Sequence, residues 1–395
     1  MQNFTFYAPT EIVFGRDTVK ETGRLAKKWG ATNALIIYGS DRVEKSGLLR
    51  SIKAQLDEEG IAHTSIGGVQ PNPRVEFARD AIQEAVRIKA DLILAVGGGS
   101  VIDTAKAVAI GAMVPDTDIW DIWTKKAPLP ETSLPVGVVL TIAAAGSETS
   151  DSAVLTYTKQ NKKIGLTADL NRPVFAIMDP GQMFTLPKEQ IACGVVDILM
   201  HTLERYFTPV ENNMLTDELA EAVMRVITTE GLAAYKNPSN YEALSEVMWC
   251  GSLSHNRLTE LGRMRDFTCH KLGHELGGMF DIPHGMTLSV LWGSWARYVY
   301  QTDPARFARY GEKVWGIKEK DDEASAQAAI KRTEQFFRDL GMPTCIGELR
   351  IGIQTDDLLM KLAESATYKD TVRLGCFQPF DLHDALAVYR MANHR

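Results

Sequence analysis

The sequence lacks several features that would assign it to other classes of protein. Its five cysteines are odd in number and include no Cys-x-x-Cys pair, so we expect reduced thiols rather than a disulfide framework. No apolar run reaches the roughly eighteen residues that a membrane-spanning helix needs, and the first residues do not resemble a secretion signal. We therefore expect a cytoplasmic protein that has no membrane partner.

Charge of one sign is nowhere concentrated. The net charge is -7, acidic and basic residues are interspersed, and no block of Lys and Arg occurs. Proteins that bind nucleic acid gather basic residues on one surface, so we expect no nucleic-acid partner. With 395 residues the chain is long enough for a large core and for two domains.

The first part of the chain alternates short β-branched runs with amphipathic stretches. Helical patterns occupy residues 48–59 and begin again at Ser100. The candidate strands are Ala34–Tyr38, Ala90–Val96, Leu134–Leu140 and Pro173–Met178. This alternation predicts βαβ units, hence an α/β domain with a mostly parallel sheet over residues 1–185.

The pattern changes to helical periodicity after Thr185. Turn residues at Asp179-Pro180-Gly181 and at Leu186-Pro187 mark the boundary. Examples of the helical stretches that follow are Leu215–Ile227, Ala324–Leu340 and Ala385–Met391. We predict an all-helical domain over residues 186–395.

Two histidine-containing segments of the helical part suggest a metal site. Asp197 and His201 are four residues apart on a buried helix, so they share one face, and a buried carboxylate needs a partner such as a divalent cation. His270 and His274 repeat this spacing on a second helix, which we expect to end at Gly277-Gly278. His284 follows, in an expected Pro-Gly loop. The spacing alone gives five candidate ligands, and imidazole with one carboxylate suits Fe(II) or Zn(II).

A glycine-rich turn in the first part resembles a phosphate-binding loop. A buried strand runs into Gly97-Gly98-Gly99 and then into a helix, on which we expect Ser100 to be the cap and Asp103 to complete a capping box. Backbone N–H groups at such a helix start favour an anion such as pyrophosphate. The usual G-x-G-x-x-G fingerprint is absent, because Ile102 occupies its third glycine position.

Two further segments could line a dinucleotide. The stretch from Thr141 to Gly146 follows a candidate strand and allows a close backbone approach. At the end of the first strand, Gly39-Ser40-Asp41-Arg42 could hold the adenosine ribose. Asp41 favours the 2′-hydroxyl of NAD, whereas Ser40 and Arg42 could hold the 2′-phosphate of NADP.

In this order, the motifs resemble those of the iron-containing, or group III, alcohol dehydrogenases, especially their butanol dehydrogenase and NADPH-dependent aldehyde reductase branch. The resemblance covers essentially the whole chain. Its carriers are Phe4 to Gly15, Gln70-Pro-Asn72-Pro73, Gly97 to Asp103, Gly146-Ser-Glu148, Phe175 to Pro180, Gly194 to Glu204, and His270-Lys-Leu-Gly-His274-Glu.

This resemblance implies a role for each candidate residue. It implies metal ligands at Asp197, His201, His270 and His284, with Fe(II) favoured over Zn(II), and it places an unligated His274 beside the nicotinamide. The implied cofactor-binding residues are Gly39, Ser40, Asp41, Asn72, Gly97, Gly98, Gly99, Ser100, Asp103, Thr141, Gly146 and Lys163. Ser40 and Arg42 favour NADP(H) over NAD(H).

The implied architecture is that of the dehydroquinate synthase type, and the implied activity is reversible hydride transfer between NAD(P)H and an aldehyde or primary alcohol. We expect His274 to relay the proton. Two alternatives are a metal- and dinucleotide-dependent cyclising lyase of the dehydroquinate synthase type and a non-catalytic metal or nucleotide sensor. Residues 4–9 and Glu11–Phe14 resemble edge strands, so we expect a homodimer.

Overall fold

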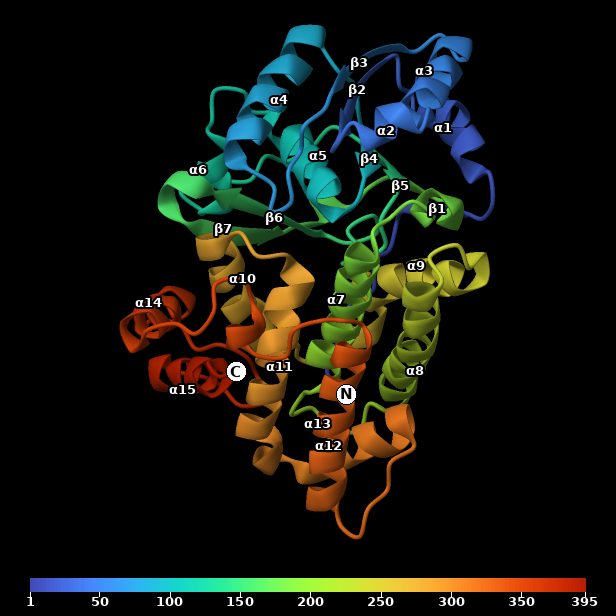
Figure 1. Ribbon diagram of the computed structural model, residues 1–395. Helices are drawn as coiled ribbons and strands as arrows, with labels where there is room; N and C mark the ends of the chain where they lie inside the picture. Colours follow the sequence, from blue (N-terminus) through green and yellow to red (C-terminus); the bar gives the residue numbers. More distant parts are fainter. The chain divides into compact units, whose positions relative to one another are not determined.

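The computed structural model describes residues 1–395, and the chain divides into two compact units. The α/β unit comprises Tyr7–Leu186, and the helical unit comprises Pro187–Arg395 together with Met1–Phe6. Figure 1 shows strands in the first unit and helices in the second. None of the helices combines the length and the apolarity needed to cross a membrane.

The α/β unit is built on a parallel six-stranded sheet, as the alternating pattern predicted. The strand order is β1-β8-β5-β4-β2-β3. The strands are β1 (Glu11–Phe14), β2 (Asn33–Tyr38), β3 (Ala62–Ile66), β4 (Leu92–Gly97), β5 (Val136–Leu140) and β8 (Phe175–Met178). Strands β4, β5 and β8 are buried along their whole length, which explains their continuous apolar sequences.

Six helices belong to this unit. They are α1 (Thr22–Lys28), α2 (Arg42–Lys45), α3 (Leu48–Glu58), α4 (Val75–Ile88), α5 (Gly99–Gly111) and α6 (Ile119–Trp123). Helix α4 buries Ala78, Ala81, Ile82 and Ala85 at helical spacing. Helix α5 is buried from Thr104 to Gly111, so it lies in the core of the unit.

Two features near the sheet differ from the sequence-based expectation. An antiparallel pair, β6 (Ser152–Tyr157) with β7 (Lys162–Thr167), was not expected. Its turn includes Asn161 at φ 49°, a left-handed conformation that asparagine tolerates better than most residues. The expectation of a strand over residues 4–9 is wrong for the single chain, which has no regular structure there, whereas β1 is an edge strand.

The helical unit contains helices and no β-strand, as its periodicity predicted. Its helices are α7 (Lys188–Tyr206), α8 (Met214–Lys236), α9 (Tyr241–His255), α10 (Thr268–Phe280), α11 (His284–Val299), α12 (Pro304–Tyr310), α13 (Asp322–Asp339), α14 (Asp356–Ala366) and α15 (Leu382–Ala392). Its core includes stacked Phe207 and Phe307, whose ring centroids lie 4.2 Å apart.

Two expected boundaries in this unit are wrong. Helix α10 continues through Gly277 and Gly278 and ends where Asp281 adopts φ 53°. A glycine inside a helix costs only about 1 kcal/mol, so two glycines do not oblige the helix to stop. His284 is not a loop residue, because it begins α11 directly after Pro283.

Candidate metal centre

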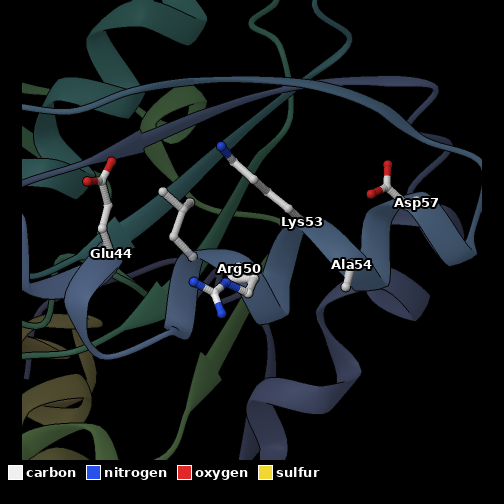
Figure 2. A pocket seen from close by; sticks show the side chains of 6 residues that line it. Glu44, Arg50, Lys53, Ala54 and Asp57 are labelled. Carbon is white, nitrogen blue, oxygen red and sulfur yellow. The ribbon is translucent and has the colours of Figure 1, made fainter.

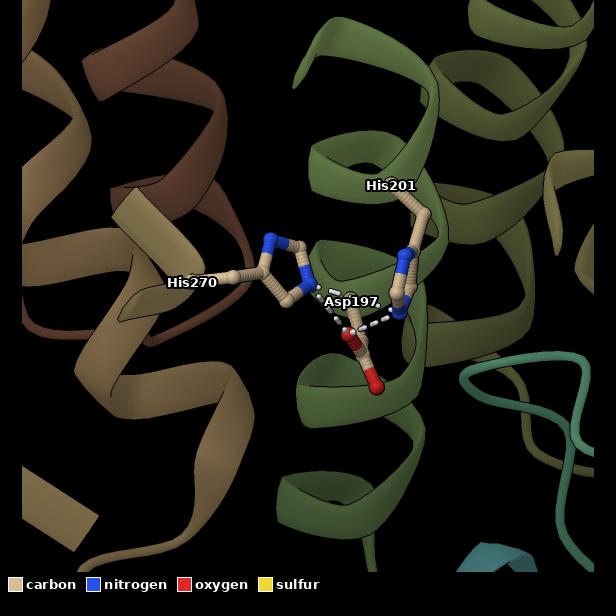
Figure 3. A group of neighbouring side chains, drawn as sticks. All are labelled: Asp197, His201 and His270. Atoms are coloured by element: carbon tan, nitrogen blue, oxygen red, sulfur yellow. Dashed lines mark hydrogen bonds and ion pairs between the residues drawn. The ribbon is translucent and has the colours of Figure 1, made fainter. Parts of the chain in front are cut away.

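Helices α7 and α10 bring three of the candidate ligands together, as Figure 3 shows. Asp197 Oδ1 lies 3.4 Å from Nε2 of His201, one turn further along α7. His270 of α10 places its Nε2 3.7 Å from the same oxygen and 3.3 Å from Nε2 of His201. All three side chains are buried, and their ligand atoms lie within 4.8 Å of one another.

This arrangement fits a divalent metal better than a structural hydrogen-bond network. Asp197 Oδ1 is buried and has no hydrogen-bond partner. A buried carboxylate oxygen left unsatisfied costs free energy that protein interiors normally avoid. Two imidazole nitrogens and one carboxylate converging on a point form a donor set that suits iron or zinc.

The two remaining candidates lie close to this group but not within it. His284, at the start of α11, places its Nε2 3.9 Å from Asp197 Oδ1, and its side chain is 22 % exposed. The ring of His274 lies one helical turn beyond His270, with centroids 6.5 Å apart, and 5.3 Å from the ring of His284. The exposed side of the cluster is therefore formed by His284 and His274.

His270 is supported from behind by a carboxylate. Its Nδ1 pairs with Oε2 of the fully buried Glu204, and its backbone N–H donates to Oε1 of Glu204 at 3.2 Å. Burial lowers the pKa of His270, but Glu204 and Asp197 outweigh burial and the pKa is raised on balance. A carboxylate on the second nitrogen orients a histidine ligand and makes it a stronger donor.

His201 has a different environment behind it. Its Nδ1 lies 3.1 Å from Nδ1 of His255, the last residue of α9, and 3.2 Å from Nη1 of Arg205. Burial, His255, His270 and Arg205 together lower the pKa of His201. Sequence reasoning missed His255, because no local spacing connects α9 with α7.

Phe267 covers the same region in a strained backbone conformation. It stands at φ 62° immediately before α10, where a bulky residue is rare. Its ring centroid lies 4.8 Å from that of His270 and 4.7 Å from the guanidinium carbon of Arg205. Strain of this kind persists only where surrounding contacts hold it, so Phe267 is part of the support of the centre.

In the α/β unit, the glycine-rich turn joins β4 to α5 under tight steric limits. A Cβ at Gly97 would lie 2.5 Å from the Val101 side chain, and one at Gly98 would lie 2.9 Å from that of Ile142. Helix α5 begins at Gly99, and Gly98 is its N-cap without any side-chain cap. The expected cap at Ser100 is therefore wrong. The first N–H groups of α5 have no side-chain acceptor, which suits an anion.

Asp103 joins α5 to the loop that contains Gly146 instead of forming the expected capping box. It accepts hydrogen bonds from Ser147 Oγ at 2.6 Å and from the backbone N–H of Val154 at 2.9 Å. The buried Lys106, one turn on, donates to Ser147 Oγ at 2.9 Å and to the carbonyl oxygen of Ser152 at 2.8 Å. These contacts fix the loop to the helix.

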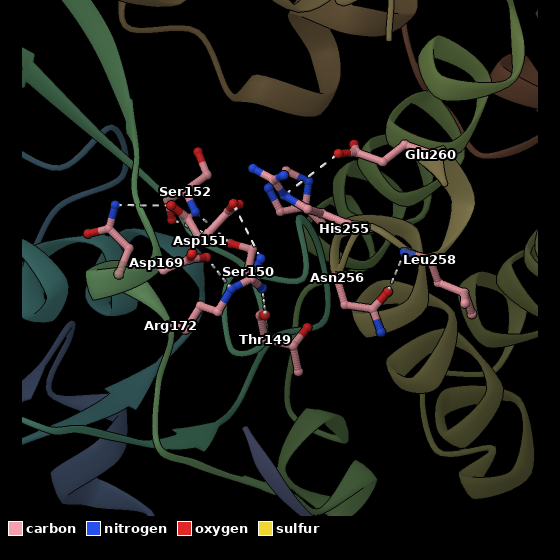
Figure 4. Close-up of polar contacts among 12 residues, drawn as sticks. Thr149, Ser150, Asp151, Ser152, Asp169, Arg172, His255, Asn256, Leu258 and Glu260 are labelled. Atoms are coloured by element: carbon pink, nitrogen blue, oxygen red, sulfur yellow. Dashed lines mark hydrogen bonds and ion pairs between the residues drawn. The ribbon is translucent and has the colours of Figure 1, made fainter. Parts of the chain in front are cut away.

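Arg172 holds the other end of that loop, as Figure 4 shows. Its guanidinium pairs with Asp151 at 3.3 Å and with Asp169 at 3.0 Å, and it donates to the carbonyl oxygen of Thr149 at 3.2 Å. Arg172 and Asp151 are both buried. The loop from Gly146 onward is thus a fixed element of the α/β unit.

The remaining cofactor candidates also lie in the α/β unit. Lys163 of β7 donates to Asn72 Oδ1 at 2.9 Å, and Asn72 adopts φ 55°. The backbone N–H of Thr141 donates to the carbonyl oxygen of Gly97. Gly39 and Ser40 follow β2, and Asp41 precedes α2 and pairs with Lys45 at 3.2 Å.

A surface hollow on the α/β unit contains none of these residues (Figure 2). Its lining consists of Glu44, Leu49, Arg50, Lys53, Ala54 and Asp57. It is an open depression beside α3, and we do not assign it to the candidate site.

Comparison with known proteins covers both units. Residues 9–180 match the family described as "Iron-containing alcohol dehydrogenase", and residues 191–393 match "Fe-containing alcohol dehydrogenase family, C-terminal". The chain is 36% identical to NADH-dependent butanol dehydrogenase A of Clostridium acetobutylicum, over 99% of each chain. It is 34% identical to the NADPH-dependent aldehyde reductase YqhD of Escherichia coli, over 92% of this chain and 94% of that protein.

The solved structures agree with this likeness. The structure of NADH-dependent butanol dehydrogenase A from Thermotoga maritima superposes with a TM-score of 0.95 at 32% sequence identity, covering 100% of this chain and 99% of the other. The E. coli YqhD structure gives a TM-score of 0.92 at 32% identity, with 99% of each chain covered.

Proposed function

This chain belongs to the iron-containing alcohol dehydrogenases, and we propose a role for each residue of its site. It is a metal-dependent alcohol dehydrogenase or aldehyde reductase that uses a nicotinamide cofactor. The helical unit, Pro187–Arg395 with Met1–Phe6, holds the metal and the substrate, and the α/β unit, Tyr7–Leu186, holds the dinucleotide. The substrate is a small aldehyde or primary alcohol. The lyase and sensor alternatives are not favoured.

The metal ligands in this proposal are Asp197, His201, His270 and His284. The observation that carries it is the buried Asp197 oxygen, which has no hydrogen bond and lies within 3.9 Å of one nitrogen of each histidine. Fe(II) is the favoured ion and Zn(II) the second candidate. A bound divalent cation would supply Lewis-acid stabilisation of the negative charge that develops on the substrate oxygen.

His274 is the proposed proton relay. Its imidazole shares α10 with His270 and lies beside His284, with its ring centroid 6.5 Å from that of His270. A neutral imidazole can accept a proton on one nitrogen and release one from the other near neutral pH. In the oxidative direction, a ring nitrogen of His274 accepts the proton that the alcohol loses and passes it to solvent or to a ribose hydroxyl.

The proposed dinucleotide site uses the segments fixed around α5. Gly97 to Ser100 hold the pyrophosphate against the first turn of the helix, and Thr141 and Gly146 line the nucleotide. Lys163 reaches a ribose hydroxyl and is oriented by Asn72. Asp103 does not contact the nucleotide in this proposal. It accepts a hydrogen bond from Ser147 and so fixes the loop that contains Gly146.

The turn after β2 supports NADP(H) as the preferred cofactor. Asp41, which would favour the 2′-hydroxyl of NAD, precedes α2 and forms an exposed ion pair with Lys45 of that helix at 3.2 Å. Ser40 and Arg42 remain as a hydroxyl and a guanidinium for a 2′-phosphate. The relatives named above include both NADH- and NADPH-dependent enzymes, so the preference rests on these residues.

We also propose that the enzyme is a cytoplasmic homodimer. Phe4 and Phe6 expose 51% and 45% of their surface, and β1 lies at the edge of the sheet. An exposed edge strand with apolar neighbours can pair with a second copy across a two-fold axis. A monomer in light scattering at micromolar concentration would contradict this assignment.

The activity is tested by anaerobic NADPH oxidation with butanal as substrate. Chelator-stripped protein is reloaded with Fe(II) or Zn(II), and Asp197→Ala treated identically is the control. We expect loss of the NADPH absorbance only with metal and only in the unaltered chain. No turnover with either metal, and none with NADH, despite demonstrated cofactor binding, would contradict the proposal.

A further inference from the structure

A histidine that binds a metal through Nε2 must carry its proton on Nδ1, and a buried N–H needs an acceptor. His201 faces the proposed metal position with Nε2, the atom nearest Asp197 and His270. Two groups lie near its Nδ1, namely Nδ1 of His255 at 3.1 Å and Nη1 of Arg205 at 3.2 Å. The role of each follows from its chemistry.

Arg205 cannot be the acceptor, because a guanidinium has donors only. Its Nη1 donates to the backbone carbonyl oxygen of His201 at 2.7 Å, and its Nε donates to Glu260 Oε2 at 2.8 Å. Its Nη2 lies 2.9 Å from Nδ1 of His255. A donor on that nitrogen requires a lone pair there, so His255 has its proton on Nε2 and offers Nδ1 as an acceptor.

We propose that His255 is the positioning residue for His201. The single lone pair on its Nδ1 is shared between the Nδ1–H of that ligand and the Nη2–H of Arg205, and Arg205 thereby fixes the tautomer of His255. The two rings meet edge to face, with centroids 4.2 Å apart. Figure 4 shows His255 and Glu260 side by side in this cluster. The inference rests on the metal site proposed above and adds a residue that does not itself bind the metal.

The charges around the metal site favour a neutral hydrogen-bond acceptor, rather than a carboxylate, behind His201. His270 already has the carboxylate of Glu204 behind it, and Asp197 supplies a second negative charge. These two charges balance a divalent cation, and a third buried carboxylate behind His201 would leave an uncompensated negative charge in a low-dielectric interior. Arg205 pairs with Glu260 at 2.8 Å, a carboxylate that Arg257 and Arg265 also approach at 3.7 Å.

Two amide variants of His255 separate positioning from a merely structural role. In His255→Asn the side-chain oxygen can occupy the place of Nδ1, whereas in His255→Gln the amide reaches the place of Nε2 and the acceptor is lost. The measurement is the Zn(II) dissociation constant of metal-stripped protein by competition with a chromophoric chelator, with melting temperature as the check on folding. We expect His255→Gln to bind Zn(II) about 10- to 100-fold more weakly, and His255→Asn to stay close to the unaltered chain.

Further variants show which proposal fails. Asp197→Asn removes a proposed ligand, and His383→Leu removes an exposed histidine of the same unit as a control for stray binding. Unaltered Zn(II) affinity in Asp197→Asn would refute the metal site itself. Weak binding by Asp197→Asn together with unaltered binding by His255→Gln would overturn only the role of His255. Equal losses in the Asn and Gln variants at equal melting temperatures would also overturn it.

Discussion

Oδ1 of Asp197 lies 3.4 Å from Nε2 of His201, both side chains are buried, and the oxygen has no hydrogen bond. Such a pair contributes little to stability, because burial of a charge without full compensation costs several kcal/mol. A stable fold gains nothing by retaining it. The relationship is explained when both atoms face a third partner, and a divalent cation satisfies both.

Removal of His274 should separate metal binding from catalysis. The ring centroid of His274 lies 6.5 Å from that of His270, against 5.3 Å for His284, so His274→Ala should retain the metal content of the unaltered chain. Turnover should fall about 100-fold or more, the usual effect of losing a positioned proton-transfer group. Metal analysis and steady-state kinetics on the same preparation measure both. Unchanged turnover would dismiss His274 as the relay.

A methyl group added at Gly285 should disturb the centre through the backbone. A Cβ at this position would lie 2.5 Å from the carbonyl oxygen and 2.6 Å from the Cα of Cys193 on α7. Gly285→Ala should therefore displace the start of α11, which carries His284, and destabilise the fold by about 1–3 kcal/mol. Melting temperature and Zn(II) affinity should both fall.

The control for this variant is Gly165→Ala. A Cβ there would lie 3.6 Å from the Val154 side chain, an ordinary contact. If Gly285→Ala behaved like Gly165→Ala in both measurements, the close approach of α7 and α11 would not position His284.

The cofactor preference should depend on Arg42. If Arg42 holds the 2′-phosphate as proposed, Arg42→Ala removes a charged hydrogen bond, so the KM for NADPH should rise about tenfold or more. The KM for NADH should not change, because NADH has no phosphate at that position. Equal effects on both cofactors, or on neither, would contradict the NADP(H) assignment.

Much of the candidate site could be predicted because it follows local periodicity. Asp197 and His201 share a face of α7 because they are four residues apart. The apolar run before Gly97 predicts a buried strand that turns into α5. The division into a parallel α/β part and a helical part follows from the change of hydrophobic period near Thr185.

The rest depends on contacts between distant segments. His255 reaches His201 across 54 residues, and Glu204 reaches His270 across 66, so no sequence spacing indicates either pair. Ser100 has the chemistry of a helix cap, but α5 already begins at Gly99, and Asp103 accepts a hydrogen bond from the distant Val154. The β6–β7 pair was missed because its second strand carries Lys162 and Lys163 rather than an alternating apolar pattern.

Lys106 should make the stability of the fold depend on pH. Burial lowers its pKa to about 8, against 10.5 in the unfolded chain, although Asp103 and Glu148 oppose the shift. Between these pH values the unfolded chain binds more protons, so the contribution of Lys106 to stability rises with pH. The free energy of unfolding should therefore increase relative to that of Lys106→Met from about pH 8 to 10.5. A constant difference across this range would refute the assignment.

Anomalous diffraction would locate the metal in the crystal. Crystals of the Zn(II)-loaded chain would be measured on both sides of the zinc absorption edge. We expect an anomalous peak about 2.0–2.2 Å from ligand atoms of Asp197, His201, His270 and His284. A peak held by other residues, or no peak at this position, would contradict it.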